Sequence, residues 1–219
     1  MTGSFQPKLG ILPPPQRALW DELGATPDDF VLYGDTAVAL HLGHRQSMDF
    51  DFFGRRPFDP IRLAEQVPYL AGATVTQQEP NTLSATIDRG GPVLVSFFGV
   101  PQIARMRRPL IAENGVRVAS LLDLAGTKAA VVQQRAEAKD YRDLHAMLEH
   151  GPVTLAAALA TACAIYGPKF NPQITLKALS YFGDGNLPSL PLETRDYLAH
   201  AAREMDLDRL PAISPEVEP

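Results

Sequence analysis

Two aspartates separated by one residue are the strongest chemical signal in this sequence. Asp49 and Asp51 lie in the apolar run Met48-Asp-Phe-Asp-Phe-Phe53, which predicts a β-strand. Successive side chains of a strand point to opposite faces, so the two carboxylates project together, and we expect the three phenylalanines of the run, Phe50, Phe52 and Phe53, to anchor it in the core. Neighbouring carboxylates repel unless a cation lies between them. Magnesium suits this pair because it takes oxygen ligands and completes its shell with substrate phosphates.

The segment just before these aspartates predicts a phosphate-binding turn. Residues 30–33 are typical of a short buried strand, Gly34 of a turn, and residues 36–42 of a helix. The first turn of such a helix, at Thr36, offers backbone N–H groups and a positive dipole end to a phosphate. Arg45 and Ser47 follow, where a guanidinium and a hydroxyl can meet phosphate oxygens, although each taken alone is more typical of a solvated loop.

A second group of charged residues lies on two predicted helices further along the chain. Ser120 and Asp123 form a variant of the capping box and open a helix that carries Lys128 near its apolar side. A lysine in this position either extends from the edge of the core to solvent or reaches a binding cleft. Asp140 and Asp143 lie at the start of the next helix, where negative charge also stabilises the positive end of the dipole.

The two groups together resemble the AbiEii/AbiGii-type nucleotidyltransferase toxins. The first matching block is Tyr33-Gly-Asp-Thr-Ala37 with Gly43-His-Arg45, Ser47, Asp49 and Asp51, and the second is Ser120-Leu-Leu-Asp-Leu-Ala-Gly-Thr-Lys128 with Arg135 through Leu144. The resemblance covers residues 30–148, about half of the chain. It implies an α+β fold, with a nucleotidyltransferase-like mixed sheet and flanking helices followed by an α-helical C-terminal half.

The resemblance also implies a reaction, in which a nucleoside monophosphate moves from a nucleoside triphosphate (NTP) to an acceptor hydroxyl with two Mg²⁺ ions as cofactors. It implies a toxin of a toxin–antitoxin or phage-defence pair, with RNA such as tRNA, or protein, as the acceptor and a cognate antitoxin as partner. Asp143 would orient Lys128 or help the acceptor to lose its proton. The implied catalytic residues are Asp49, Asp51, Lys128 and Asp143, the metal ligands are Asp49 and Asp51, and the nucleotide-binding residues are Gly34, Thr36, Arg45 and Ser47.

Two departures from the family pattern support an alternative function. Asp35 stands where the family commonly has glycine or serine, and its carboxylate either caps the helix that begins at Thr36 or repels a phosphate. Ser96 stands on a strand where polymerase-like transferases carry a third acid, and Asp88 is a candidate substitute. The alternative is a catalytically weakened nucleotide-binding or protein-interaction module on the same fold, and a phosphoester hydrolase is a third candidate.

Composition and charge exclude several other classes of protein. The chain has 219 residues, 45% hydrophobic and 21% charged, which is typical of a globular protein. Its net charge of −5 argues against nonspecific binding of nucleic acid through charge alone. The densest basic run holds Arg105, Arg107 and Arg108, with Arg117 nearby, and we favour a solvated connector over an RNA contact because no aromatic residues interleave. No stretch predicts a membrane span or a secretory signal, so we expect a cytoplasmic protein.

The histidines and the single cysteine predict no further chemistry. His41 and His44 share a helix face only if their helix runs through residue 43, which is glycine, and His145 with His150 has the wrong spacing for a zinc pair on one helix. Cys163 lies in an alanine-rich helical segment and is typical of a small buried hydrophobe. We therefore assign no zinc site from the sequence.

Proline and glycine positions divide the chain into regions. We expect a helix over residues 12–24, a mixed sheet with a helix at 60–67 inside residues 30–98, and helices over 120–134, 139–149, 153–165, 172–182 and 192–205. The expected organisation is a nucleotidyltransferase-like core at residues 1–115, a helical region at 116–210 that contributes Lys128 and Asp143 to the cleft, and a flexible tail at 211–219.

Overall fold

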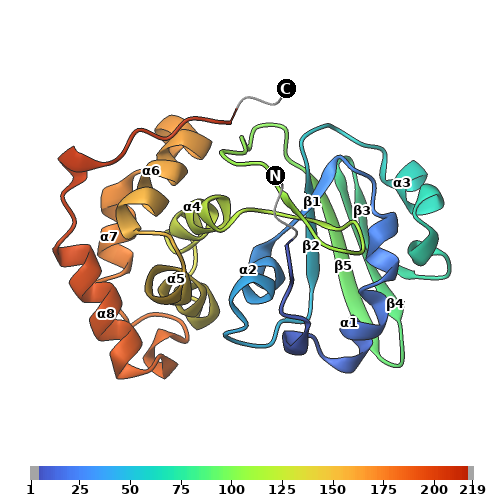
Figure 1. The fold of residues 1–219 in the computed structure, drawn as a ribbon, viewed down its shortest axis with the longest axis horizontal. Helices are drawn as coiled ribbons and strands as arrows, with labels where there is room; N and C mark the ends of the chain where they lie inside the picture. The colour runs from blue at the N-terminus through green and yellow to red at the C-terminus, as the bar shows by residue number, and fades with distance from the viewer. Residues whose placement is uncertain (1–4, 217–219) are drawn as a thin grey trace. The chain divides into compact units, whose positions relative to one another are not determined.

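A computed structural model describes residues 5–216, which form two compact units (Figure 1). Unit 1 extends to Ile103 and also includes Pro109–Ala119. Unit 2 consists of Ala104–Arg108 and the chain from Ser120 onward. The five residues Ala104–Arg108 thus lie between the two parts of unit 1 in the sequence but pack with unit 2. Among the described residues, no helix combines the length and the apolar character needed to cross a bilayer.

Unit 1 is built on a mixed sheet of seven strands in the order β3-β4-β5-β2-β1-β7-β6. β2 pairs antiparallel with β1 and parallel with β5, so it lies in the middle of the sheet. The mixed sheet expected from the sequence is confirmed. The strands are β1 Phe30–Tyr33, β2 Phe50–Gly54, β3 Thr74–Glu79, β4 Thr82–Asp88, β5 Pro92–Gly99, β6 Leu110–Ile111 and β7 Arg117–Val118.

The helices of unit 1 are α1 Pro14–Leu19, α2 Gly34–Leu42 and α3 Pro60–Gln66. The first helix is shorter than expected, and a 3₁₀ turn at Glu22–Ala25 follows it. The Trp20 carbonyl accepts from the Leu23 N–H of this 3₁₀ turn at 3.2 Å and also from Asn114 Nδ2 at 2.6 Å, so a distant side chain adds to the bond made by the turn. At α3, Asp59 caps the helix by accepting from the Ile61 N–H at 2.9 Å.

Strand alternation in β2 separates the core from the candidate site. Phe50 and Phe52 are fully buried on one face of the sheet. The expectation that Phe53 also anchors the core is wrong, because residue 53 shares the opposite face with Asp51 and is only half-buried. The Phe53 ring stacks instead on Tyr33 of β1, with ring centroids 4.9 Å apart. An aromatic pair therefore adjoins the aspartate face of the sheet.

Unit 2 is α-helical, as the sequence predicts. Its helices are α4 Leu121–Val131, α5 Ala138–His150, α6 Leu155–Tyr166, α7 Pro172–Ala178 and α8 Leu192–Arg203. α4 packs against α5 and α6, and α8 packs against α5 and α7. A Cβ on Gly126 of α4 would lie 2.5 Å from Thr161 Cγ2 of α6, so glycine allows the close approach of these two helices.

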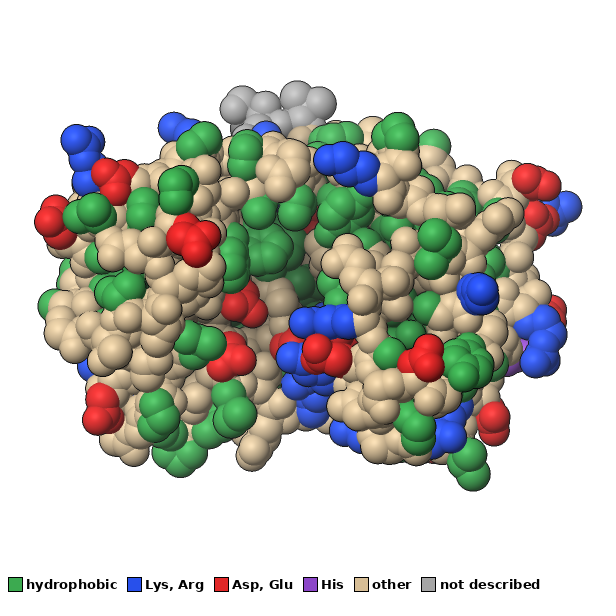
Figure 2. All heavy atoms as spheres, turned by 180° about the vertical axis from the view of Figure 1, so that it is seen from behind, with side chains coloured by type: hydrophobic (Ala, Val, Ile, Leu, Met, Phe, Trp, Pro, Cys, Tyr) green, Lys and Arg blue, Asp and Glu red, His purple; other side chains and the backbone are tan. Residues whose placement is uncertain are grey.

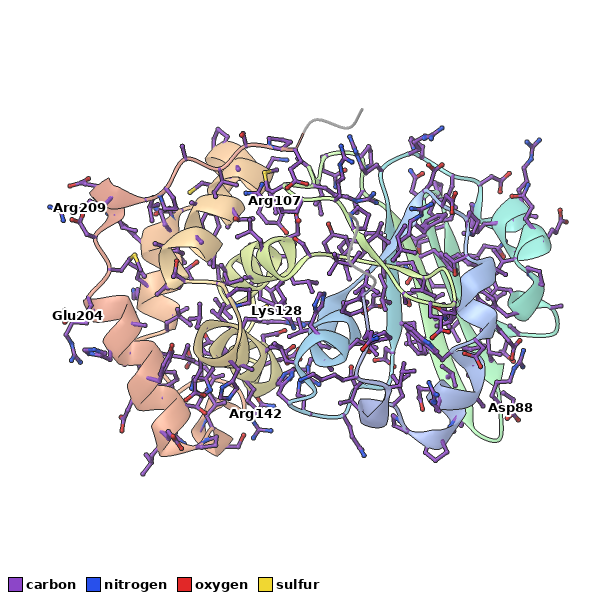
Figure 3. The ribbon with its side chains drawn as sticks, in the orientation of Figure 1. Asp88, Arg107, Lys128, Arg142, Glu204 and Arg209 are labelled. Atoms are coloured by element: carbon purple, nitrogen blue, oxygen red, sulfur yellow. The ribbon has the colours of Figure 1, made fainter. Side chains whose placement is uncertain are left out.

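The segment Ala104–Arg108 is attached to unit 2 through a buried carboxylate. Asp123 accepts hydrogen bonds from the N–H groups of Met106 at 2.7 Å and Arg107 at 3.0 Å. The N–H of Glu216 donates to the Met106 carbonyl at 3.1 Å, and the Glu216 carboxylate lies 3.4 Å from Nε of Arg107 (labelled in Figure 3). Glu216, in the tail that was predicted to be flexible, thus contacts Met106 and Arg107. Residues 217–219 of this tail lie outside the described residues.

The surface carries both signs of charge. In the view of Figure 2, Lys and Arg side chains and Asp and Glu side chains are both scattered over this face, among many hydrophobic side chains. Arg107 of the basic run contacts Glu216, and the nearby Arg117 contacts Asp28 at 2.9 Å, so both arginines are held in intramolecular ion pairs. The choice between a connector and an RNA contact for the run stays a prediction.

Candidate functional site

A glycine turn and a carboxylate meet at the centre of unit 1. Gly34 follows β1 and opens α2 with a φ of +70°, a left-handed conformation that favours glycine. A Cβ at this position would lie 2.9 Å from Oδ2 of Asp51 on β2. The turn therefore needs glycine for its backbone conformation and also for the space beside the Asp51 carboxylate.

Two buried hydroxyls fix the loop that carries Asp49. Thr36 lies in the first turn of α2, and its Oγ1 is 2.7 Å from Ser47 Oγ and also within reach of the Asp49 carbonyl. Thr36 and Ser47 are 1% and 6% exposed, so these contacts are shielded from water. Because a hydroxyl carries a single proton, Thr36 donates to one of these oxygens at a time. The pair ties the loop before β2 to the start of α2.

The two aspartates of the motif differ in exposure. Asp51 is half-buried within β2, in register with Tyr33 of β1 and Ser96 of β5. Asp49 is exposed and immediately precedes the strand, which begins at Phe50. The structure thus gathers Gly34 and Asp51 at the turn, and joins Thr36 of α2 to Ser47 and Asp49 in the loop before β2.

Asp35 forms an ion pair rather than a helix cap. Its Oδ2 lies 3.1 Å from Nη2 of Arg45, and both side chains are 20% exposed. The N-cap of α2 is Tyr33 and has no side-chain hydrogen bond, so the expectation that Asp35 caps the helix is wrong. The two opposite charges offset each other, which reduces the repulsion that Asp35 would exert on an approaching phosphate. The pair also holds Arg45 against the first turn of α2.

A pair of serine hydroxyls occupies the strand position where a third acid was considered. Ser96 of β5 lies in register between Asp51 and Ser84 of β4, and Ser84 Oγ donates to Ser96 Oγ at 3.0 Å. Asp88 lies four residues beyond Ser84, at the end of β4, and its Oδ1 accepts from the N–H groups of residues 90 and 91 at 2.9 and 3.0 Å. The hypothesis that Asp88 replaces the third acid is therefore wrong, because its carboxylate closes the β4–β5 turn.

In unit 2, Lys128 of α4, labelled in Figure 3, reaches two carboxylates of α5. Its Nζ lies 2.7 Å from Asp140 Oδ1 and 2.8 Å from Asp143 Oδ2. Lys128 is 4% exposed and both aspartates are 0% exposed. Residues three apart on a helix share a face, which allows both acids to meet one ammonium group. The alternative that Lys128 extends to solvent is therefore excluded.

Asp140 and Arg135 also belong to this cluster, although neither is among the site residues predicted from the sequence. Arg135 Nε lies 2.7 Å from Asp140 Oδ2 and its Nη2 lies 3.1 Å from Oδ1, a two-point contact between guanidinium and carboxylate. Asp140 thus lies between two cations and links Arg135 to Lys128. The sequence signal that could have identified Asp140 is its three-residue spacing from Asp143, since that spacing places both carboxylates beside the same partner.

Comparison with known proteins identifies a family for most of the chain. A family model described as nucleotidyl transferase AbiEii toxin, type IV toxin–antitoxin system, matches residues 17–217. An uncharacterized protein of Aquifex aeolicus (strain VF5) is 35% identical over 134 residues, 57% of this chain and 60% of that protein. The match therefore spans about three fifths of the length of this curated relative.

Solved structures share the fold at low sequence identity. The nucleotidyltransferase toxin MenT4 of Mycobacterium tuberculosis H37Rv matches with a TM-score of 0.61 and 13% identity, over 86% of this chain and 83% of that chain. A candidate nucleotidyltransferase of H. pylori matches with a TM-score of 0.51 and 20% identity, over 85% of this chain and 89% of that chain. At these identities the likeness establishes a nucleotidyltransferase-like fold.

Proposed function

This chain belongs to the AbiEii family of nucleotidyl transferase toxins of type IV toxin–antitoxin systems, and on that premise we propose that it transfers a nucleoside monophosphate from an NTP to an acceptor hydroxyl. The observation that carries this proposal is the approach of Gly34 to Asp51. A left-handed glycine turn opens a helix directly beside a carboxylate. The N-terminus of a helix attracts phosphate, and the carboxylate supplies oxygen to the metal ion that accompanies a nucleotide.

Asp49 and Asp51 fit a magnesium site by the chemistry of their donors. Both supply only oxygen, the donor that Mg²⁺ prefers, and the missing Cβ of Gly34 leaves space at Oδ2 of Asp51. Two Mg²⁺ ions, when bound, would activate the attacking oxygen and stabilise the departing pyrophosphate. Asp49 and Asp51 are the proposed ligands of both ions.

The remaining residues are proposed to position and neutralise the triphosphate. The first turn of α2, from Gly34 to Thr36, and the Arg45 guanidinium bind phosphate oxygens, while Asp35 orients Arg45. Thr36 and Ser47 fix the loop that presents Asp49, in addition to any contact with phosphate. Positioning and charge stabilisation carry most of the catalysis in phosphoryl-type transfer.

We assign Lys128 to neutralisation of the phosphates and Asp143 to orientation of Lys128 or to deprotonation of the acceptor. In the same cluster, Asp140 orients Lys128 from its other side and is itself held by Arg135. The proposed acceptor is RNA such as tRNA, or protein, and the proposed partner is a cognate antitoxin in the cytoplasm.

One observation favours a second candidate, a catalytically weakened module that binds nucleotide or protein. The buried Ser96–Ser84 pair supplies no charge at the position of a third acid, which lowers the affinity expected for metal. The other argument for this candidate was that Asp35 would repel a phosphate. The ion pair with Arg45 removes it, because Asp35 is not an isolated negative charge. Retention of both motif aspartates and of the Lys128 cluster favours the transferase.

The test is magnesium-dependent transfer from each of the four α-labelled NTPs to total cellular RNA and to protein. We expect the wild type to label one acceptor class and the Asp49→Asn, Asp51→Asn double variant to lose at least about 100-fold in rate. Glu65→Gln, which changes an exposed acid of α3, is the matched control and should label like the wild type. Labelling that persists in the double variant would refute the assigned metal site, and nucleotide binding without any labelling would favour the module.

A further inference from the structure

Gln16 of α1 is a buried polar residue on an otherwise apolar helix face, and the proposed reaction gives it no role. It is 4% exposed, and Leu19 and Trp20, which follow it by three and four residues on the same face, are 0% and 2% exposed. The Trp20 ring contacts Phe50, the first residue of β2, with ring centroids 6.3 Å apart. The buried face of α1 therefore adjoins the point where the loop that carries Asp49 enters the strand.

A hydrogen bond from Gln16 holds one of the two peptide units that flank Asp49. Nε2 of Gln16 donates to the Met48 carbonyl at 3.0 Å, and this carbonyl shares a planar peptide unit with the Asp49 N–H. The next peptide unit, which carries the Asp49 carbonyl, accepts from Oγ1 of Thr36. Only the φ and ψ rotations of Asp49 lie between the two units. The two hydrogen bonds together therefore set the direction in which the Asp49 side chain leaves the backbone.

Apolar burial does not hold this loop in place. Of residues 43–49, only Ser47 is buried, and the apolar side chain of Met48 is 62% exposed. The Thr36 hydroxyl has one proton for two acceptors, Ser47 Oγ and the Asp49 carbonyl, whereas an amide group such as that of Gln16 has two. The bond from Gln16 to the Met48 carbonyl is therefore not in competition with a second acceptor.

Stability alone does not explain a glutamine at this position. Oε1 of Gln16 is buried and has no hydrogen-bond partner among the described residues. A buried oxygen without a partner costs at least as much as one neutral hydrogen bond contributes, so a methionine of similar shape would serve the core as well or better. A polar group that breaks the apolar pattern without a gain in stability is typical of a functional position.

We propose that Gln16 positions Asp49 for the binding of Mg²⁺. This inference rests on the proposed function, in which Asp49 and Asp51 are the metal ligands. Gln16 acts through the Met48 carbonyl and contacts neither the ion nor the nucleotide. Residues that orient metal ligands in this way typically contribute about 10–100-fold to metal affinity.

The first test is the Mg²⁺ dependence of nucleotide binding by the full-length chain, measured with each of the four NTPs. Gln16→Met should raise the Mg²⁺ concentration for half-maximal binding at least about tenfold, and saturating Mg²⁺ should restore binding. Its unfolding temperature should be unchanged or raised by up to about 4 °C. Gln133→Met is the matched control, because Nε2 of Gln133 also donates to a backbone carbonyl, that of Asn171 at 2.8 Å, in unit 2. The control should require as much Mg²⁺ as the wild type.

The second test needs neither metal nor nucleotide. The order parameter of the Asp49 amide, from nitrogen-15 relaxation of the metal-free chain, should fall from about 0.85 to below about 0.6 in Gln16→Met and stay high in Gln133→Met. An unchanged order parameter, or equal Mg²⁺ requirements of the two variants, would overturn the proposal. A wild type that binds no nucleotide with Mg²⁺ would instead refute the proposed function, and the order parameter would then decide whether Gln16 positions Asp49.

Discussion

At the scale of single residues, the cluster around Lys128 shows how buried charge is tolerated in this protein. Lys128, Asp140 and Asp143 are almost completely inaccessible, and each would carry a large desolvation cost alone. Arg135 adds a second positive charge, so two carboxylates face two cations. Each buried charge of the cluster has an oppositely charged partner within 2.8 Å, and removal of Lys128 takes that partner from both aspartates.

Lys128→Met tests this balance, since it removes the ammonium group and leaves Asp143 without that partner. We expect the free energy of unfolding to fall by about 3–5 kcal/mol, the usual result of breaking a buried pair on one side. Urea unfolding followed by circular dichroism provides the measurement. Lys139→Met, which changes a lysine whose side chain is 45% exposed, should have little effect. Equal stability of the two variants would contradict the burial argument.

A second prediction at this scale concerns the glycine beside Asp51. Gly34→Ala forces a left-handed backbone at a cost of about 1–2 kcal/mol and places a Cβ 2.9 Å from Asp51 Oδ2. Gly72→Ala is a matched control, because its φ is +76° and no atom lies within 4 Å of the added Cβ. Both variants should lose similar stability in thermal unfolding, but only Gly34→Ala should lose magnesium-dependent nucleotide binding. If both retain binding, contact with Asp51 is not important for the site.

At the scale of secondary-structure elements, α4 organises unit 2 through its first turn. Ser120 caps the helix by accepting from the Asp123 N–H at 3.0 Å, and the Ser120 hydroxyl donates to Asp123 Oδ2 at 2.6 Å. Asp123 does not complete a standard capping box, because its carboxylate also accepts from Met106 and Arg107. The helix start thus holds a separate segment of chain, and burial raises the pKa of Asp123 although these hydrogen bonds oppose the shift.

Asp123→Ala should release residues 104–108 while α4 stays folded. Hydrogen–deuterium exchange should become faster at the amides of Met106 and Arg107, since both amides lose the Asp123 carboxylate oxygens that accept their hydrogen bonds. Ser120→Ala is the comparison, because it removes the cap at a cost of about 1 kcal/mol but leaves the carboxylate in place. Protection of Met106 and Arg107 that is unchanged in Asp123→Ala would show that other contacts hold the segment.

At the scale of the whole molecule, each unit contains a histidine whose neutral form is favoured by folding. Burial lowers the pKa of His41 in unit 1 below its ordinary 6.5, against a hydrogen bond with the Ala119 carbonyl at 2.8 Å. His145 in unit 2 is shifted in the same direction. Below pH 6.5 the unfolded chain therefore binds more protons at these positions than the folded chain does.

We accordingly predict that stability is fully present above pH 6.5 and is lost as the pH falls through the lowered pKa values of the two histidines. Fluorescence of the single tryptophan, Trp20, reports on unit 1 and should show a smaller pH dependence of urea unfolding in His41→Gln. Far-ultraviolet circular dichroism reports on the helices of unit 2 and should likewise show a smaller pH dependence of urea unfolding in His145→Gln. Asp123 has the opposite sign, because its raised pKa removes stability as the pH rises above 3.8. An unchanged pH profile in both histidine variants would refute the linkage.

The sequence by itself determined the local structure of this protein. The strand that carries Asp51, the glycine turn at residue 34 and the helical second half were all predicted, because side-chain periodicity and turn chemistry act over a few neighbouring residues. The same local patterns carried the resemblance to the nucleotidyltransferase toxins, which the family match confirms. The eight site residues themselves remain a prediction about function.

Only the tertiary structure decided which charges meet. It paired Asp35 with Arg45, added Asp140 and Arg135 to the Lys128 cluster, and joined residues 104–108 to Asp123. Side-chain partners of this kind depend on the register of strands and the packing of helices, which bring together positions that no local pattern connects. The physical reason is that a buried charge or hydrogen-bonding group must find its partner in three dimensions, whereas secondary structure depends mainly on the residues beside it in the chain.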